Sequence, residues 1–191
     1  MKKQFKLLLV MVLILALLPC AAACGGGDEE SEDEGILARM EKMLDSQGRS
    51  YGEVITGKTG ETLSTAFFDF TVSEVKAAEE LDEYKPQSEG HRFIVAEVSV
   101  KNTTDQIIPV GNYDFSILWE SEEEIAEEDQ YPYKSFMEGM YPDDTTLNPG
   151  DTLSGSVVFE IPSDISDFAI VYDEVYDDEF EGDSYMVECK L

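Results

Sequence analysis

The sequence predicts an all-β fold, an antiparallel β-sandwich of about seven strands, and three observations support this. Residues 92–101 alternate between apolar and polar side chains, which is typical of a strand with one face in a core and the other in water. Further segments of strand length follow, and turn sequences separate them. Almost no helical spacing appears after residue 52, so the domain is expected over residues 53–191.

The predicted strands occupy residues 64–75, 92–101, 107–110, 115–119, 152–161, 168–172 and 185–190. Apolar side chains at every second position mark the face expected in the core, as Phe70 does in the first segment. Pro109 cannot donate a backbone hydrogen bond, which makes the third segment an edge strand. The polar residues 102–105 have turn chemistry. Trp119 ends the fourth segment and is expected in the core.

The first 23 residues are predicted to be a lipoprotein signal peptide, outside the folded domain. A basic head at residues 1–6 precedes an apolar run at residues 7–18 and three alanines at residues 21–23. A helix made of that apolar run would extend only about 18 Å, short of the ~30 Å hydrocarbon core of a bilayer. A membrane-spanning helix is therefore the weaker interpretation.

Cys24 follows this signal, and its surroundings resemble a bacterial lipobox, in which small residues precede a cysteine that receives lipid. Ala21 stands where a lipobox usually has Leu, and Cys20 fits less well because Pro19 directly precedes it. We expect lipid on Cys24 and thus a protein held at the extracellular face of the cell membrane. The alternative is ordinary cleavage at the same bond, with Cys24 left as a free thiol. If Cys20 leaves with the signal and Cys24 takes lipid, Cys189 has no partner for an internal disulfide and is expected to be buried.

Acidic residues dominate the composition, with 42 Asp and Glu against 13 Lys and Arg. Loss of Lys2, Lys3 and Lys6 with the signal leaves 10 basic residues and a net charge of −32. This charge repels phosphate, so nucleic acid is not an expected partner. A solvated acidic surface is the simplest interpretation, and cation binding is the alternative. Residues 24–52 are expected to form a flexible acidic tether, with the spacing of one short helix near its middle.

Three segments carry a resemblance to a known family: residues 98–105 (VSVKNTTD), 147–155 (LNPGDTLSG) and 157–162 (VVFEIP). Together they resemble a family of Gram-positive lipoprotein domains of unknown function that share the telokin-like, immunoglobulin-like β-sandwich. The resemblance covers residues 53–191 and implies that fold and a location on the surface of a Gram-positive bacterium. It implies no shared ligand and no catalytic residues. The acidic insertion at residues 120–144 departs from the family pattern.

The end of this insertion is rich in aromatic and methionine side chains, and it is the predicted ligand-binding loop. Tyr131, Tyr133, Phe136 and Tyr141 could form an adaptable surface for a protein or a sugar, since sandwich domains usually bind through loops at one end. The alternative is that these rings fold back and cover an open edge of the sandwich.

A second candidate is an acidic stretch near the C-terminus that aligns with the spacing of an EF-hand calcium loop. The candidate ligands of Ca²⁺ are Asp177, Glu179, Glu181, Asp183 and Glu188. Glu replaces shorter Asp or Asn at two ligand positions, and strands rather than helices are expected on both sides. An acidic hairpin turn is therefore the alternative.

No motif in the sequence carries a prediction of catalysis. Residues 48–52 match the G-x-S-x-G string, but a charged linker precedes them where that motif needs a strand. His91 is the only histidine, and no cysteine or histidine spacing suits zinc. We therefore expect no enzymatic activity and no cofactor. The favoured hypothesis is a membrane-anchored, non-catalytic binding or adhesion module for an exported protein or a cell-wall component. The alternative is a structural envelope protein that handles Ca²⁺ or Mg²⁺.

Overall fold

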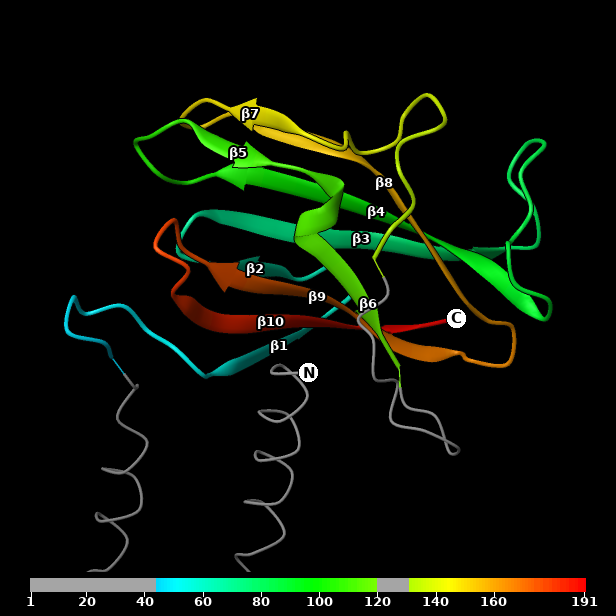
Figure 1. Ribbon diagram of the computed structural model, residues 1–191, viewed down its shortest axis with the longest axis horizontal. Helices are drawn as coiled ribbons and strands as arrows, with labels where there is room; N and C mark the ends of the chain where they lie inside the picture. The colour runs from blue at the N-terminus through cyan, green and yellow to red at the C-terminus, as the bar shows by residue number, and fades with distance from the viewer. Residues whose placement is uncertain (1–43, 120–130) are drawn as a thin grey trace, which may run out of the picture. The chain divides into compact units, whose positions relative to one another are not determined.

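A computed structural model describes residues 44–119 and 131–191 (Figure 1). The predicted signal peptide, Cys24 and the first part of the tether lie outside the described residues, as does the most acidic part of the insertion. Within the described ranges, no helix is long and apolar enough to cross a membrane.

The described residues form ten strands and one short 3₁₀ helix, so the all-β prediction is confirmed. The strands are β1 (Val54–Lys58), β2 (Thr62–Ser64), β3 (Phe68–Ala78), β4 (His91–Asn102), β5 (Ile108–Val110), β6 (Phe115–Leu118), β7 (Thr145–Leu147), β8 (Thr152–Pro162), β9 (Asp167–Val175) and β10 (Glu181–Lys190), and the helix η1 spans Asn112–Asp114. The sequence predicted seven of these strands. It missed β1, β2 and β7, which have five, three and three residues.

The strands form two four-stranded sheets and a two-stranded ribbon. One sheet has the order β1-β10-β9-β6, the other has the order β2-β3-β4-β8, and β5 pairs with β7 (Figure 1). Every pairing between these strands is antiparallel except that of β1 with β10, which is parallel. The sandwich therefore departs from the predicted antiparallel arrangement at its β1 edge.

The core lies between the two four-stranded sheets and follows the predicted alternation. Ile94, Ala96, Val98 and Val100, which share one face of β4, are all buried, as are Val157, Phe159 and Ile161 of β8. Their burial removes apolar surface from water and is the main favourable contribution to folding. The buried residues that cluster with them from the opposite sheet include Ile117, Ile170, Tyr172, Tyr185 and Val187. Cys189 is buried in the same cluster, as expected.

Two of the segments that carry the family resemblance meet in space at one end of β4. The backbone N–H of Asn102 donates to the carbonyl of Asp151, and the N–H of Gly150 donates to the carbonyl of Asn102, each over 3.0 Å. The Asn102 side chain is buried, and its amide donates to the carbonyls of Gln106 (2.7 Å) and Leu147 (2.9 Å). Its oxygen accepts from both the N–H and the hydroxyl of Thr104. Asn102 thus joins its own turn to the strand β7.

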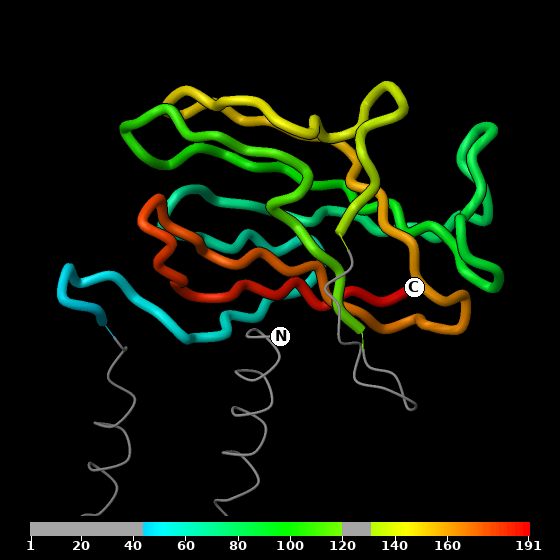
Figure 2. Tube along the Cα trace, viewed as in Figure 1, coloured from blue at the N-terminus to red at the C-terminus, as the bar shows by residue number. Residues whose placement is uncertain are grey.

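Residues 44–52, which were expected in the tether, contact the turn between β9 and β10. The Arg49 guanidinium forms ion pairs with Asp45 (2.7 Å) and Asp178 (2.8 Å). It also lies 4.0 Å from the ring centroid of Phe180 and 4.8 Å from that of Tyr176. Figure 2 shows this N-terminal stretch at one end of the sandwich and the connection between β3 and β4 projecting at the other.

Candidate functional site

The aromatic end of the insertion runs along β8, which is an edge strand of its sheet. The N–H of Tyr133 donates to the carbonyl of Val158 (2.8 Å), and the N–H of Tyr141 donates to that of Ser156 (2.9 Å). The N–H of Ser156 in turn donates to the carbonyl of Gly139 (3.0 Å). These bonds satisfy edge groups that would otherwise be open to pairing with another chain. This arrangement agrees with the alternative interpretation of the segment as an edge cover.

Side chains of the same segment, which we call the cover segment (residues 131–144), build a second apolar cluster. Phe93 and Val158 point to the outer face of their sheet and are buried there with Met140. Tyr133 and Phe136 pack over them, and the Tyr133 ring lies 5.6 Å from that of Phe93 in an edge-to-face arrangement. Phe136 is therefore a packing residue rather than a residue of an open binding surface.

Tyr141 does not take part in a surface site, and its predicted role in ligand binding is wrong. Its side chain is 0% exposed and belongs to the main core, where its ring lies 6.1 Å from that of Phe115. The backbone bond to Ser156 places it there, because the cover segment crosses β8 at Gly155 and turns inward. A ligand in solvent cannot reach this ring.

The buried hydroxyl of Tyr141 makes no hydrogen bond to any described residue, which gives a stability prediction. Tyr141→Phe should leave the free energy of unfolding unchanged or raise it by up to about 1 kcal/mol, because an unpaired buried hydroxyl is costly. Urea denaturation measures the change. Tyr185→Phe is the matched control: the Tyr185 hydroxyl donates to buried Glu174 over 2.9 Å, so its loss should lower that free energy by about 1–2 kcal/mol. A loss above 1 kcal/mol for Tyr141→Phe would contradict the assignment.

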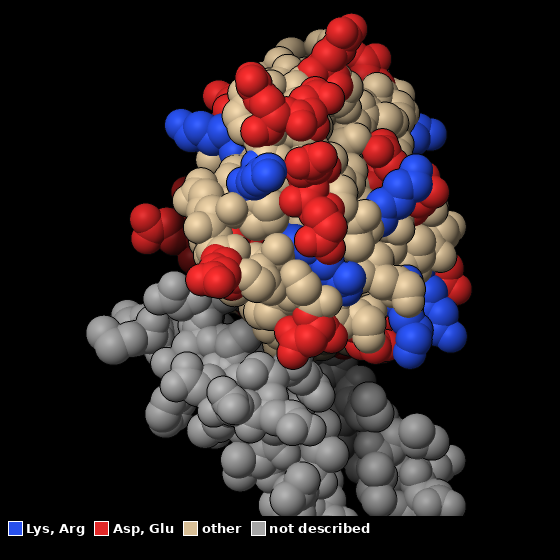
Figure 3. Space-filling model, turned by 90° about the vertical axis from the view of Figure 1, so that its right-hand side faces the viewer, with Lys and Arg blue, Asp and Glu red and all other residues tan. Residues whose placement is uncertain are grey.

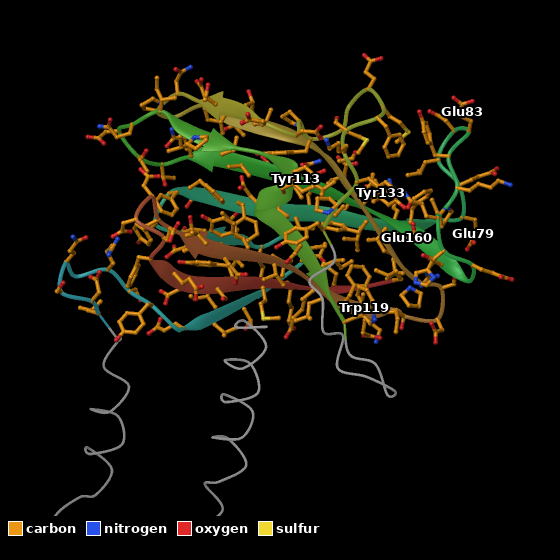
Figure 4. All side chains as sticks on the ribbon, viewed as in Figure 1. Glu79, Glu83, Tyr113, Trp119, Tyr133 and Glu160 are labelled. Atoms are coloured by element: carbon orange, nitrogen blue, oxygen red, sulfur yellow. The ribbon has the colours of Figure 1, made fainter. Side chains whose placement is uncertain are left out.

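A pocket of about 360 Å³ lies between the cover segment, the end of β6, the strand β8 and the connection that leads into β4 (Figure 4). The residues that line it are Gln87, Ser88, His91, Trp119, Tyr131, Pro132, Tyr133 and Glu160. Tyr131 and Tyr133, two of the predicted binding residues, are thus brought together. Trp119 was expected in the core; it packs against the core but also lines the pocket. We call this the Trp119–Glu160 pocket.

Glu160 is the fixed polar group of the pocket. One of its carboxylate oxygens accepts from the backbone N–H of Gln87 (2.9 Å) and the other from that of Ser88 (2.8 Å). The hydroxyl of Tyr133 donates to the same carboxylate. Burial alone would raise the pKa of Glu160, but the hydrogen bonds from Tyr133, Gln87 and Ser88 outweigh it and lower that pKa. Burial and the bond to Glu160 raise the pKa of Tyr133 to about 12. At neutral pH the pair is therefore a carboxylate and a neutral phenol.

The other lining residues supply ring faces and hydrogen-bonding groups. Tyr131 is 56% exposed and forms part of the rim. The Nδ1 atom of His91 lies 3.2 Å from the carbonyl oxygen of Glu89. Trp119 contributes an indole ring and one N–H donor. The volume is within the usual range of ligand pockets, although the lining is more polar than is usual for them.

The five acidic residues of the EF-hand-like stretch are spread along the β9–β10 hairpin. Asp177 and Glu179 lie in its exposed turn, and Asp183 is buried and accepts from the N–H of Glu53 (3.0 Å). Glu188 follows on the same strand, roughly 17 Å further along at the rise of an extended chain. In the parts of the chain that the structure describes, no group of three or more His, Cys, Asp or Glu could hold a metal ion. Extended strands separate these carboxylates, whereas an EF-hand loop would wrap them around one point.

Residues 48–52, the G-x-S-x-G string, do not form a nucleophile elbow. Strand β1 follows them instead of the helix that this motif requires. Gly48 and Gly52 have positive φ angles and form bends around the Arg49 ion pairs.

Comparison with known proteins supports the family that the motifs indicated. Residues 57–181 match the family model described as Domain of unknown function (DUF4352). No curated protein sequence matches this chain.

Among solved structures, a candidate lipoprotein (ycdA) from Bacillus subtilis is similar, with a TM-score of 0.51 and 16% identity over 70% of this chain and 39% of that chain. This chain thus corresponds to well under half of that protein. The secreted protein MPT63 from Mycobacterium tuberculosis has a TM-score of 0.49 and 13% identity, over 71% of this chain and 98% of its own. A β-sandwich protein from Clostridium difficile 630 has a TM-score of 0.42 and 14% identity, over 74% of this chain and 97% of its own. The likeness to ycdA supports the β-sandwich fold, and the chain belongs to the DUF4352 family of domains of unknown function.

Proposed function

We propose that this chain is a lipid-anchored extracellular lipoprotein whose sandwich acts as a non-catalytic binding module. The Trp119–Glu160 pocket is the observation that carries the binding role. It combines three aromatic side chains, Trp119, Tyr131 and Tyr133, with a carboxylate held in place by two backbone N–H groups. Pockets of this size take a small molecule or one chemical group of a larger partner. The partner class is therefore an exported protein or a cell-wall component that presents such a group.

The anchor is supported by the sequence before the domain and by one structural relative. The basic head, the apolar run and the alanines before Cys24 have the order of a lipoprotein signal. The similar ycdA structure is described as that of a candidate lipoprotein. A diacylglycerol with a further acyl chain on Cys24 would hold the protein at the extracellular face of the membrane, since each buried CH₂ contributes about 0.8 kcal/mol.

Mass spectrometry of the N-terminal peptide of the chain expressed in a Gram-positive host tests the anchor. We expect the mature chain to begin at Cys24 and to carry lipid. Cys24→Ala should abolish labelling by a fatty-acid analogue, whereas the control Cys20→Ala should keep it, because Cys20 leaves with the signal. A mature chain that begins with an unmodified cysteine would refute the lipid anchor.

A fluorescence screen tests the binding role, because Trp119 is the only tryptophan in the chain and lines the pocket. Sugars of the cell wall, amino-acid derivatives and small amines are added to the full chain in detergent, and the Trp119 emission is followed. We expect at least one class to bind, with affinity reduced about tenfold by Tyr131→Ala, given what one stacked ring contributes. Tyr113→Ala is the matched control, a 42% exposed tyrosine outside the pocket, and should not change the affinity. If no class changes the emission, or both variants act alike, this pocket is not the ligand site.

A further inference from the structure

The Trp119–Glu160 pocket holds one carboxylate, and His91 is the only basic side chain among its described lining residues. Glu160 is the one Asp or Glu among its lining residues, and neither Lys nor Arg lines it. Within residues 44–119 and 131–191, no Lys or Arg forms an ion pair with Glu160. Two backbone N–H groups and the Tyr133 hydroxyl hold the carboxylate instead. They keep it ionised and in a fixed position, but they leave its formal charge uncompensated.

Aromatic side chains line the pocket together with this carboxylate. Trp119, Tyr131 and Tyr133 line the same pocket, and Tyr133 is bonded to Glu160 directly. The face of an aromatic ring attracts a cation, Trp most strongly, and the attraction rises when the cation loses water. A carboxylate together with two or three such faces is the arrangement expected for a positively charged organic group.

The same molecule holds a cation in this way at its other end. The Arg49 guanidinium lies 4.0 Å from the centroid of Phe180 and 4.8 Å from that of Tyr176, and it pairs with the carboxylates of Asp45 and Asp178. There the cation belongs to the chain itself. The Trp119–Glu160 pocket has the rings and the carboxylate but contains no cation from the described part of the chain.

The surface near the pocket adds a long-range attraction for cations. The connection between β3 and β4 contributes Gln87 and Ser88 to the pocket, and its exposed carboxylates are Glu79, Glu80, Asp82, Glu83 and Glu89. Lys85 is the only basic residue in residues 79–90. Figure 3 shows many acidic side chains over this end of the molecule, with basic side chains both among them and toward the sides. Such a field draws cations toward the pocket and repels anions.

We propose that the Trp119–Glu160 pocket binds an organic ammonium group, such as that of a lysine side chain, a polyamine or a choline head group. This inference rests on the proposed binding function and names its ligand class. A neutral sugar could stack on the same rings, but it would leave the charge of Glu160 unbalanced. The shared chemistry is a cationic nitrogen bearing CH groups, which contacts the rings of Trp119 and Tyr131 while its charge faces Glu160.

Titrations that follow Trp119 emission from the full chain in detergent test this proposal. The cationic probes are choline, cadaverine and Nα-acetyl-lysine amide, which separate the three sources of the group. The neutral probes are 3,3-dimethylbutan-1-ol, which has the shape of choline without its charge, and N-acetylglucosamine. We expect at least one cationic probe to bind and the neutral alcohol to bind at least roughly tenfold more weakly.

Two variants that each remove one negative charge distinguish a direct contact between the probe and Glu160 from a general attraction to the acidic surface. Glu160→Gln should weaken the cationic probe about tenfold, whereas Glu83→Gln, which removes an exposed carboxylate outside the pocket lining, should change its affinity less than twofold. Because Glu160 also holds the 87–88 backbone, circular dichroism checks that the variant folds. If that variant does not fold, Tyr131→Ala and Tyr113→Ala replace the pair: the first should weaken binding of the cationic probe about tenfold, and the second should change it less than twofold.

The outcomes separate this inference from the proposed function. Binding of N-acetylglucosamine with the same dependence on Tyr131, and no binding of ammonium probes, would overturn the ligand class and leave the binding function standing. Equal weakening by Glu160→Gln and Glu83→Gln would show attraction to the whole surface and would also overturn the ligand class. No response to any probe, or to the wider screen, would overturn both.

Discussion

Gly155→Ala is expected to lower the free energy of unfolding by about 3 kcal/mol and to detach the cover segment from β8. A Cβ atom at this position would lie 2.6 Å from the backbone nitrogen of Tyr141 and 2.9 Å from the carbonyl carbon of Met140. Both are backbone atoms, so no side-chain rotation relieves the clash. The segment must move away, and Tyr141 must then leave the core or strain the bonds that hold it to Ser156.

Urea denaturation and amide hydrogen exchange measure the two parts of this effect. Ser154→Ala is the control, since Ser154 lies beside Gly155 and its hydroxyl makes a surface bond to Ser99 (3.0 Å). That change should cost less than about 0.5 kcal/mol. The close packing would be contradicted if Gly155→Ala unfolded at the same urea concentration as the parent and kept slow exchange at the Tyr141 N–H.

Asn102→Ala is also expected to lower the free energy of unfolding by about 3 kcal/mol, for a different reason. The buried side chain makes four hydrogen bonds, and its loss leaves the carbonyl of Leu147 without this buried donor, whereas the carbonyl of Gln106 is at an exposed residue and also accepts from the Thr104 hydroxyl. Unsatisfied buried carbonyls are costly because the interior offers no water to replace the lost partner. This side chain joins the ribbon of β5 and β7 to the turn after β4. In the Asn102→Ala variant the amide hydrogens of that ribbon should exchange faster than in the parent protein, and more so than those of the two four-stranded sheets.

Asn148→Ala provides a comparison within the turn that contacts Asn102. The Asn148 amide donates to the carboxylate of Asp151 (2.8 Å) at an exposed position, where water can replace it. Its removal should lower the free energy of unfolding by no more than about 0.5 kcal/mol. Equal losses from the two asparagines, measured by urea denaturation, would mean that the buried network is not what makes Asn102 important.

The long strands could be predicted from the sequence because their two faces differ. Ile94, Ala96, Val98 and Val100 are apolar and alternate with residues on the other face, which fixes both the strand and its orientation. The strands β2 and β7 have three residues each, as does β5, so length alone does not separate the short strands that were missed from the one that was predicted. The parallel pairing of β1 with β10 joins residues some 130 positions apart, for example Val54 with Ser184, and no local pattern encodes it.

The position of the cover segment is indicated in the sequence by apolar residues on strand faces that were expected in water. Phe93 and Val158 are apolar residues on the outer faces of β4 and β8, and both are buried. Apolar side chains on the expected wet face indicate that something covers them. The aromatic residues of the insertion supply that cover, which accounts for Phe136 and Tyr133.

The pocket could be predicted only in part. Tyr131 and Tyr133 were recognised because they stand together in an aromatic stretch. Glu160 lies on β8 in a chain with 42 acidic residues, and nothing local distinguishes it. Its role arises from the N–H groups of Gln87 and Ser88, which the topology brings to it from 73 and 72 positions away in the sequence, respectively. Trp119 was assigned to the core, rather than to a sugar platform, because it lies on a predicted strand; it directly follows β6 and is also one of the residues that line the pocket.

The parallel pair of β1 and β10 determines how the domain would respond to tension under the proposed anchorage. If the membrane anchor and a partner in the pocket were pulled apart, the force would act on the N-terminal stretch around Arg49 at one end of the sandwich and on the pocket at the other (Figures 1 and 2). It would act along the axis of β1, so the hydrogen bonds between β1 and β10 would be loaded together in shear rather than opened one after another. The ion pairs of Arg49 would have to break before the force acted on the strands. The domain should therefore withstand stretching far better than it would if its first strand were attached by a hairpin that could be peeled away.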